Sequence, residues 1–173
     1  VDACFWNIYP LWRFLNFIKM TEKKPLKRVP ELQPLSHDHH HGLQLCWKIR
    51  TGFSKKVPHE RIKKYTDWFY ENHLKPHFEL EEKYIFPVLD SKNELVQQAL
   101  SEHKNLRYLF EQKTVLEIYL LQIEKELQNH IRFEERILFA EIQKIATAEQ
   151  LSKINSIHTR VTFTENENDP FWI

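Results

Sequence analysis

The apolar residues of this chain recur every three or four positions in four long segments, a spacing typical of helices with one buried face. The second segment contains Pro76 and Pro87, where we expect kinks or local breaks. Capping and helix-breaking residues set the expected bounds of the helices: Ser36 to near Gly52, Pro58 toward Leu89, Ser91 onward, and Thr114 to about Ala146. The pattern therefore predicts an all-α fold, an up-down antiparallel four-helix bundle with short connections.

Paired capping residues support several helix starts. A Ser or Thr followed three residues later by Glu or Gln can satisfy the free N–H groups at a helix N-terminus. Such pairs precede the third helix, the fourth helix and a short fifth helix that ends near Ile157: Ser91 with Glu94, Thr114 with Glu117, and Thr147 with Gln150. The polar run at residues 164–169 predicts an exposed tail, and we expect Phe171 and Trp172 to fold back onto the helices.

The chain of 173 residues is long enough for one domain with a substantial core. We expect an N-terminal extension at residues 1–34, the four-helix bundle at residues 35–158 and a C-terminal tail at residues 159–173. Residues 1–19 are aromatic and apolar, but interspersed polar residues exclude a membrane span or a regular signal peptide. Because Met20 is the only methionine, two interpretations of residues 1–19 stay open: a segment that is not native, or an amphipathic anchor.

Composition narrows the classes of partner and compartment. The 25 Lys and Arg residues nearly balance the 24 Asp and Glu residues, so a net charge of +1 offers no strong field for nucleic acid or an anionic membrane. The two cysteines, Cys4 and Cys46, do not indicate a disulfide framework, because Cys46 falls on an apolar helix face. We therefore expect a cytoplasmic protein without a nucleic-acid or membrane partner. The unusual feature of the composition is its ten histidines.

Histidine and glutamate residues interrupt the apolar lines of three helices at positions that should face the core. These lines are Leu74, His77, Glu81, Tyr84 and Val88 in the second helix, Val96, Ala99, His103, Leu106 and Phe110 in the third, and Leu116, Leu120, Ile123, Leu127, His130, Glu134, Ile137 and Glu141 in the fourth. The second and fourth helices thus share a His-x-x-x-Glu arrangement, which places both side chains on one face, one turn apart.

The first helix offers four histidines within residues 37–41, and only one or two of them can face the core. At about 100° per residue, His39 falls near the centre of the apolar face and His40 lies to its side. That face consists of Leu43, Leu45, Cys46, Ile49 and Phe53. We predict that His39 faces the core, with His40 as the alternative if the first turn is kinked.

Four imidazoles and two carboxylates in one narrow core need a partner of opposite charge, because burying an ionised group without such a partner costs several kcal/mol. No Lys or Arg shares these apolar lines. A single buried histidine is most often a hydrogen-bonded core residue, but six such groups together indicate a bound cation. A ligand set of imidazole and carboxylate is typical of iron or manganese sites, whereas structural zinc sites are usually rich in thiolate.

Four stretches between Leu35 and Ile145 together resemble the hemerythrin-like, His-His-Glu (HHE) cation-binding domains: LSHDHHHGL (35–43), HFELEEKYIFP (77–87), EHKNL (102–106) and HIRFEERILF (130–139). The resemblance implies a centre of two non-haem iron ions, with manganese and zinc as less favoured alternatives. It further implies that four histidines are terminal ligands and that two glutamates bridge the ions, namely His39, His77, His103 and His130 with Glu81 and Glu134.

The chain departs from the oxygen-carrying hemerythrins at Arg107, where those proteins place a second histidine one turn after the one that matches His103. Three alternatives stay open: an open coordination position, a water ligand, or a substitute ligand such as His73, one turn before His77. His73 could instead orient a ligand from outside the centre or lie at the surface. Nearby acidic residues are assigned to solvated faces, namely Glu79, Glu82 and Glu135, or to an outer hydrogen-bond acceptor, namely Glu141.

These features favour a di-iron protein that binds or senses a small oxidant (O2, NO or peroxide) at an open site. Sensing would require a protein partner, because the sequence contains no output domain. The alternative is a di-iron enzyme that acts in peroxide reduction or in iron-centre repair under oxidative or nitrosative stress. Iron storage or structural metal binding is a third interpretation, and the sequence leaves open whether the protein is an enzyme.

Overall fold

The computed structural model describes residues 27–157 and 163–173, so the predictions for residues 1–19 lie outside the described part. Within these ranges the structure is all-helical, without a β-strand. Its α-helices are α1 (Gln33–Ser54), α2 (His59–Phe69), α3 (Lys75–Leu80), α4 (Glu94–Glu111), α5 (Leu116–Phe133), α6 (Phe139–Ile145) and α7 (Ala148–Ile157). None of the helices in this part of the chain combines the length and the apolar character that crossing a bilayer requires.

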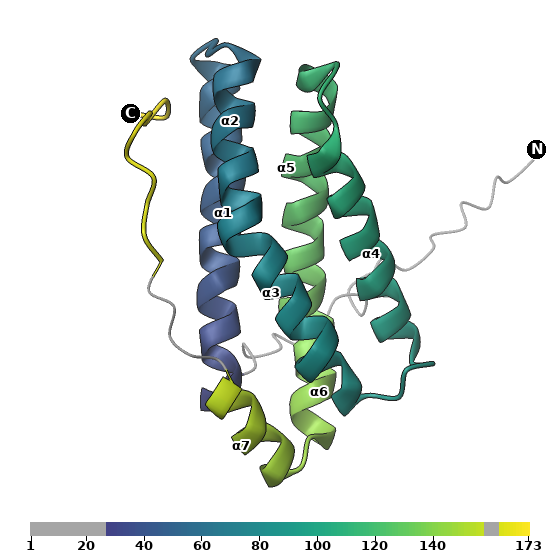
Figure 1. Cartoon of the computed structure of the whole chain (residues 1–173). Coiled ribbons are helices and arrows are strands. Elements are labelled where there is room, and N and C mark those ends of the chain that lie inside the picture. The colour runs from purple at the N-terminus through teal and green to yellow at the C-terminus, as the bar shows by residue number, and fades with distance from the viewer. Residues whose placement is uncertain (1–26, 158–162) are drawn as a thin grey trace, which may run out of the picture.

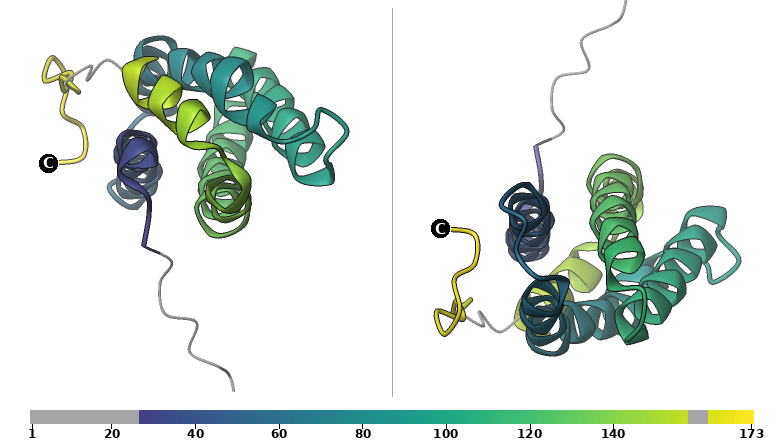
Figure 2. Two further views of the ribbon diagram at one scale, coloured as in Figure 1. Left: turned by 90° about the horizontal axis from the view of Figure 1, so that it is seen from below. Right: turned by 90° about the horizontal axis from the view of Figure 1, so that it is seen from above.

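Two of the long helical segments are composite. α2 continues through Tyr70–Leu74 into α3, and α5 continues through Glu134–Leu138 into α6. α1 packs against α2 and α5, α4 packs against α5, and the long segments run side by side in Figure 1. The short α7 lies across one end of them, next to the 3-10 turn Pro30–Leu32, as Figure 2 shows from below. The prediction of a short fifth helix is therefore confirmed.

A π-turn at Glu81–Ile85 changes which residues of the second helical segment face the core. A π-turn contains one more residue than an α-helical turn, so the inward positions that follow it move along by one residue. Tyr84 and Val88, both predicted core positions, are only partly buried, and Ile85 and Leu89 are buried in their place. Val88 still packs against an apolar cluster of the core.

The same shift follows the π-turn Glu134–Leu138 in the last long segment. Ile137, a predicted core residue, is 50 % exposed, and Glu141 pairs with Lys144 at the surface. Leu138 and Ile142 are buried instead. Both π-turns begin at a predicted metal-bridging glutamate, so the regular 3.6-residue period held as far as that glutamate and failed just beyond it.

The predicted irregularities at the two prolines of the second segment are both present. Pro76 lies in the first turn of α3, directly after the π-turn Tyr70–Leu74, and the helix axis changes direction there in Figure 1. π-turns and prolines are the usual causes of such kinks. Pro87 lies in the 3-10 turn Phe86–Val88, which ends the segment.

The predicted start of the first helix was wrong, because α1 begins at Gln33 and Ser36 lies within its first turns. The helix ends at Ser54, close to the predicted end, but Gly52 does not have the predicted role. Gly52 is a buried residue of the helix interior: a Cβ there would lie 2.7 Å from Ile62 Cδ1 and 2.9 Å from Phe171 Cε2. Gly52 therefore permits a close approach of neighbouring side chains and does not terminate the helix.

Two of the three predicted capping pairs were also misplaced. Asn93, not Ser91, caps α4, and its side-chain oxygen accepts from a backbone N–H of the first turn at 2.9 Å. Val115 precedes α5 in the left-handed conformation (φ 48°), which leaves Thr114 outside the capping position. The pair Thr147 and Gln150 forms as predicted, with reciprocal bonds of 2.8 and 3.2 Å to the backbone.

The buried side chains form two apolar clusters with a polar layer between them. One cluster packs α1, α2, α4 and α5 around residues such as Ile49, Phe69 and Phe110. The other lies toward α6 and α7, around residues such as Leu35, Ile85 and Phe139. On each long segment the predicted metal-binding residues fall at the boundary between the two clusters. The apolar packing on either side thus fixes the position along the helix axes at which the polar side chains meet in the core.

The C-terminal residues fold back onto α1 and α2, as predicted for Phe171 and Trp172. Phe171 is buried in the first cluster, and the Trp172 ring covers Lys48 Nζ at 3.8 Å. The polar tail is not fully exposed: Glu165 accepts hydrogen bonds from Lys48 and from Tyr65 Oη. These contacts attach the described end of the chain to the helices.

Candidate metal centre

Six polar side chains from four helical segments meet in the boundary layer, and each is at most 6 % exposed. They form two groups of four potential ligand atoms, and the atoms of each group lie within 4.8 Å of one another. One group is His39, His77, Glu81 and Glu134, and the other is Glu81, His103, His130 and Glu134. Because both glutamates belong to both groups, the arrangement offers two adjacent cation positions with two shared carboxylates.

The distances around the two glutamates fit ligand atoms that share an ion. His77 Nε2 lies 3.2 Å and His103 Nε2 3.4 Å from Glu81 oxygens. His39 Nε2 lies 3.0 Å and His130 Nε2 3.4 Å from Glu134 Oε2. Atoms that bind one ion at about 2.1 Å are roughly 3 to 4 Å apart, so little movement would be needed to bind one.

An outer carboxylate holds the other ring nitrogen of each histidine. The Nδ1 atoms donate to Asp38 at 3.2 Å (His77), Glu82 at 2.8 Å (His103), Glu102 at 2.8 Å (His130) and Glu135 at 2.7 Å (His39). An ionised carboxylate can only accept, so these bonds place the proton on Nδ1 and leave the Nε2 lone pair facing the glutamates. Neutral imidazoles oriented in this way are the form that binds a metal.

The outer carboxylates follow a regular scheme. Each one is the sequence neighbour of a candidate ligand but serves the histidine of the next helical segment. Thus α1 supplies Asp38 to α3, the turn after α3 supplies Glu82 to α4, α4 supplies Glu102 to α5, and the turn after α5 supplies Glu135 to α1. The assignment of Glu82 and Glu135 to solvated faces was therefore wrong, and so was that of Glu141 as an outer acceptor.

The unpaired atoms of the layer test whether a metal fits it. The Nε2 atoms of His39 and His77 and all four oxygens of Glu81 and Glu134 are buried without a hydrogen-bond partner among the described residues. In addition, His103 Nε2 and His130 Nε2 lie 3.0 Å apart, although both lone pairs point at each other once Nδ1 carries the proton. Buried polar atoms are normally satisfied, so this concentration of bare acceptors favours bound cations.

In the absence of a metal cation, protons bound to the histidines offset the negative charge of the buried glutamates. Burial lowers the pKa of His77, but the charge of Glu81 and the bond to Asp38 outweigh it and raise the pKa to about 9. The pKa values of His39 and His103 are also raised, because neighbouring carboxylates outweigh burial. The same histidines hold the pKa of Glu81 well below its ordinary value against the effect of burial. Metal ions and protons therefore compete for this layer.

The structure separates the predicted core residues from the alternatives. His40 is exposed and contacts Gln44 Nε2 at 3.2 Å, so it lies outside both groups. His73 also lies outside them, with its ring 4.6 Å from that of Phe163. Arg107 pairs with Glu82 at 2.9 Å, and Glu82 is the carboxylate that accepts from His103 Nδ1.

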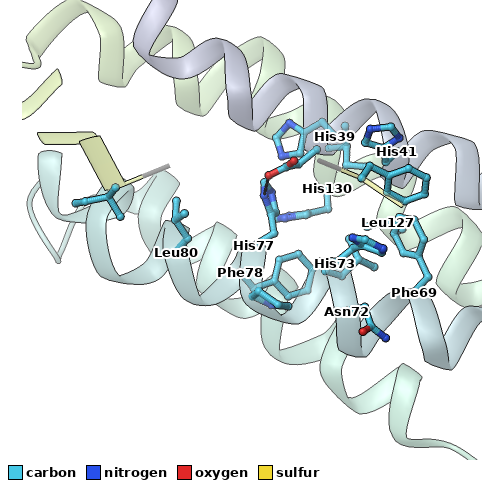
Figure 3. A pocket seen from close by; sticks show the side chains of 16 residues that line it. His39, His41, Phe69, Asn72, His73, His77, Phe78, Leu80, Leu127 and His130 are labelled. Carbon is cyan, nitrogen blue, oxygen red and sulfur yellow. Dashed lines mark hydrogen bonds and ion pairs between the residues drawn. The ribbon is translucent and has the colours of Figure 1, made fainter. Parts of the chain in front are cut away.

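A cavity of about 240 Å³ reaches the layer from one side. Its wall includes three of the layer's histidines, His39, His77 and His130, together with His73 (Figure 3). Phe163 also lines it. Because the cavity ends at these ligand candidates, a small molecule can approach the layer without unfolding of the helices.

The fold and the layer together define a helical domain with a carboxylate- and histidine-rich site suited to cations. The chain belongs to the hemerythrin family, since the model of the hemerythrin HHE cation binding domain matches residues 31–142. No curated protein and no solved structure matches the chain significantly. The match covers every residue of the layer, and the resemblance inferred from the sequence motifs is thereby confirmed.

The outer carboxylates give a testable prediction at Glu102. Glu102→Ala removes the acceptor that fixes His130, so we expect metal affinity to fall roughly 10- to 100-fold. Glu102→Gln keeps an accepting oxygen and should lose less. Competition titrations with a chelator measure the affinity, and Glu111→Ala, an exposed change on the same helix, is the matched control. Equal affinities for Glu102→Ala and the control would contradict this role.

Proposed function

We propose that this chain is a non-haem di-iron protein that binds or senses a small oxidant, such as O2, NO or peroxide, on an up-down four-helix bundle. The observation that carries the proposal is the pair of ligand groups sharing Glu81 and Glu134. In the proposal, these glutamates bridge two iron ions, and His39, His77, His103 and His130 complete the two ends. Imidazole and carboxylate ligands within helices are typical of such centres.

The chain's own residues would perform three tasks. The four outer carboxylates orient the imidazoles, the apolar clusters exclude bulk water, and the cavity admits the small molecule. The iron pair would supply the electrons and the coordination positions for the oxidant. Arg107 supports an open position, since it binds Glu82 and adds no ligand where oxygen carriers have a histidine. In this arrangement His73 supplies no metal ligand, because it lies in the cavity wall.

The alternative is a di-iron enzyme that reduces peroxide or repairs iron centres under oxidative or nitrosative stress. The observation that favours it is the size of the cavity, which exceeds what a diatomic ligand needs. A sensing role would instead need an output partner, which we propose to be a protein. A cytoplasmic location and the lack of nucleic-acid and membrane partners also stay predictions.

Anaerobic reconstitution followed by metal analysis and optical spectroscopy tests the proposal. We expect about two iron ions per chain, as in other carboxylate-bridged helical centres. Exposure of the reduced protein to O2, NO or H2O2 should change the iron absorption spectrum. A change that reverses when the gas is removed supports binding or sensing, and continued consumption of H2O2 supports the enzyme. Fewer than one iron per chain after careful loading would exclude a di-iron protein.

A further inference from the structure

The cavity beside the metal centre is larger than a small oxidant requires. Its volume is about 240 Å³, whereas an engineered protein cavity of about 150 Å³ is enough for a benzene molecule. A diatomic molecule would occupy only a small part of this space and would lose most of the contacts that the wall can provide. The volume therefore fits an organic molecule with at least one ring.

The wall of the cavity favours an uncharged molecule. Much of it is apolar, with contributions from α2, α3, α5 and the C-terminal residues, including Phe69, Leu74, Phe78, Leu127, Ile131 and Phe163. No Lys or Arg is among the described residues that line it. His39 and His77, which also line it, already pair with carboxylates of the layer. An anion would therefore find no unpaired counter-charge among the described side chains of the wall, whereas a neutral ring could replace water against the apolar side chains.

Most polar groups of the wall already have partners. Asp38 accepts from His77, and Asn72 donates to the backbone oxygen of Trp68 at 2.8 Å. His41 contacts Gln44 Oε1 at 3.1 Å through Nδ1, and its ring stacks on Phe163 with centroids 4.0 Å apart. These groups orient the wall and leave little hydrogen-bonding capacity for a ligand.

His73 differs from these groups. Its Nε2 atom is buried without a hydrogen-bond partner among the described residues, and aromatic rings of Trp68, Phe69 and Phe163 surround it at 4.6 to 5.1 Å between centroids. Burial, together with the nearby His41, lowers the pKa of His73, which keeps the ring neutral near pH 7. A neutral imidazole can donate through one nitrogen and accept through the other. Figure 3 shows the ring among the lining side chains.

We propose that the cavity binds a neutral aromatic alcohol or phenol, whose ring packs on the apolar wall and whose hydroxyl group hydrogen-bonds to His73. The ligand lies next to His39, His77 and His130. The inference rests on the proposed function only where it places the ligand beside a di-iron centre. The small oxidant and the organic molecule would then share one entrance.

Isothermal titration calorimetry of the iron-loaded protein with benzyl alcohol tests this inference. We expect saturable binding of benzyl alcohol, weaker binding of toluene, which lacks the hydroxyl group, and the weakest binding of benzoate. His73→Phe should weaken benzyl alcohol binding by up to roughly tenfold through the lost hydrogen bond and leave toluene binding nearly unchanged. His40→Phe, a change of the same type at an exposed histidine, is the matched control.

Filling the cavity provides a second arm. Leu127→Phe should fill the cavity and abolish binding of both neutral probes. If the Leu127→Phe protein does not fold, Leu80→Trp is used instead, because Leu80 is a less buried position of the same wall. Absence of binding to protein with full iron content, tighter binding of benzoate, or equal effects of His73→Phe on both neutral probes would overturn the inference. Iron content measured in the same samples separates these outcomes from a failure of the proposed di-iron centre, which would appear as missing iron.

Discussion

Glu81→Gln is expected to remove nearly all iron from the chain, and Glu134→Gln is expected to do the same. Each substitution keeps the shape of the side chain but replaces a charged group shared by both ligand groups with a neutral amide. The four imidazoles are neutral when they bind metal, so one remaining carboxylate would face two divalent ions. Metal analysis after anaerobic loading should therefore fall from about two iron ions per chain to near zero, not to one.

The matched control for this experiment is Glu79→Gln, which makes the same chemical change at an exposed position of α3. It should retain full iron content. Circular dichroism of each variant at pH 7 separates loss of metal from loss of fold, since the helices of a folded, metal-free protein still give a helical spectrum. Retention of one firmly bound iron in Glu81→Gln would contradict equal sharing of this glutamate by two ions.

The positions of the six layer residues could be predicted because each interrupts an otherwise apolar line. Helical periodicity is reliable where a segment is regular, and the helix was regular from Lys75 to Glu81 and from Leu116 to Glu134. The π-turns that begin there carry no clear sequence signal, so the prediction failed for Tyr84 and Ile137, which follow within four residues. The layer was therefore easier to predict than the packing just beyond it.

The outer carboxylates were missed for a different reason. Glu82 and Glu135 are partly exposed, and a periodic pattern assigns such positions to solvent. Their partners lie on another helical segment, and sequence spacing within one helix does not show which segments are neighbours. The available signal was that an acidic residue directly precedes or follows one candidate ligand on every segment, as with Asp38 and Glu102.

Removal of the metal is expected to make the stability of the protein strongly dependent on alkaline pH. In the metal-free protein, the pKa of His77 is about 9, above its value in an unfolded chain. Its protonation stabilises the folded state fully below the unfolded pKa, and this contribution is lost as the pH rises through about 9. Between pH 7 and pH 10 the loss is on the order of 2 kcal/mol, which corresponds to a fall in Tm of roughly 5 to 10 °C.

The iron-loaded protein is the control, because a metal-bound imidazole carries no proton on Nε2 that could be lost in this range. His39 and His103 also have raised pKa values in the metal-free protein, so their deprotonation adds to this loss. Lys48 and Lys63 are buried cations as well, and burial lowers the pKa of each. They lie outside the metal layer and change the stability of both forms alike, so the informative quantity is the difference in Tm between loaded and metal-free protein. That difference should widen from pH 7 to pH 10. If it stays constant, protons do not replace the metal between His77 and Glu81, and the layer must be compensated in another way when the iron is removed.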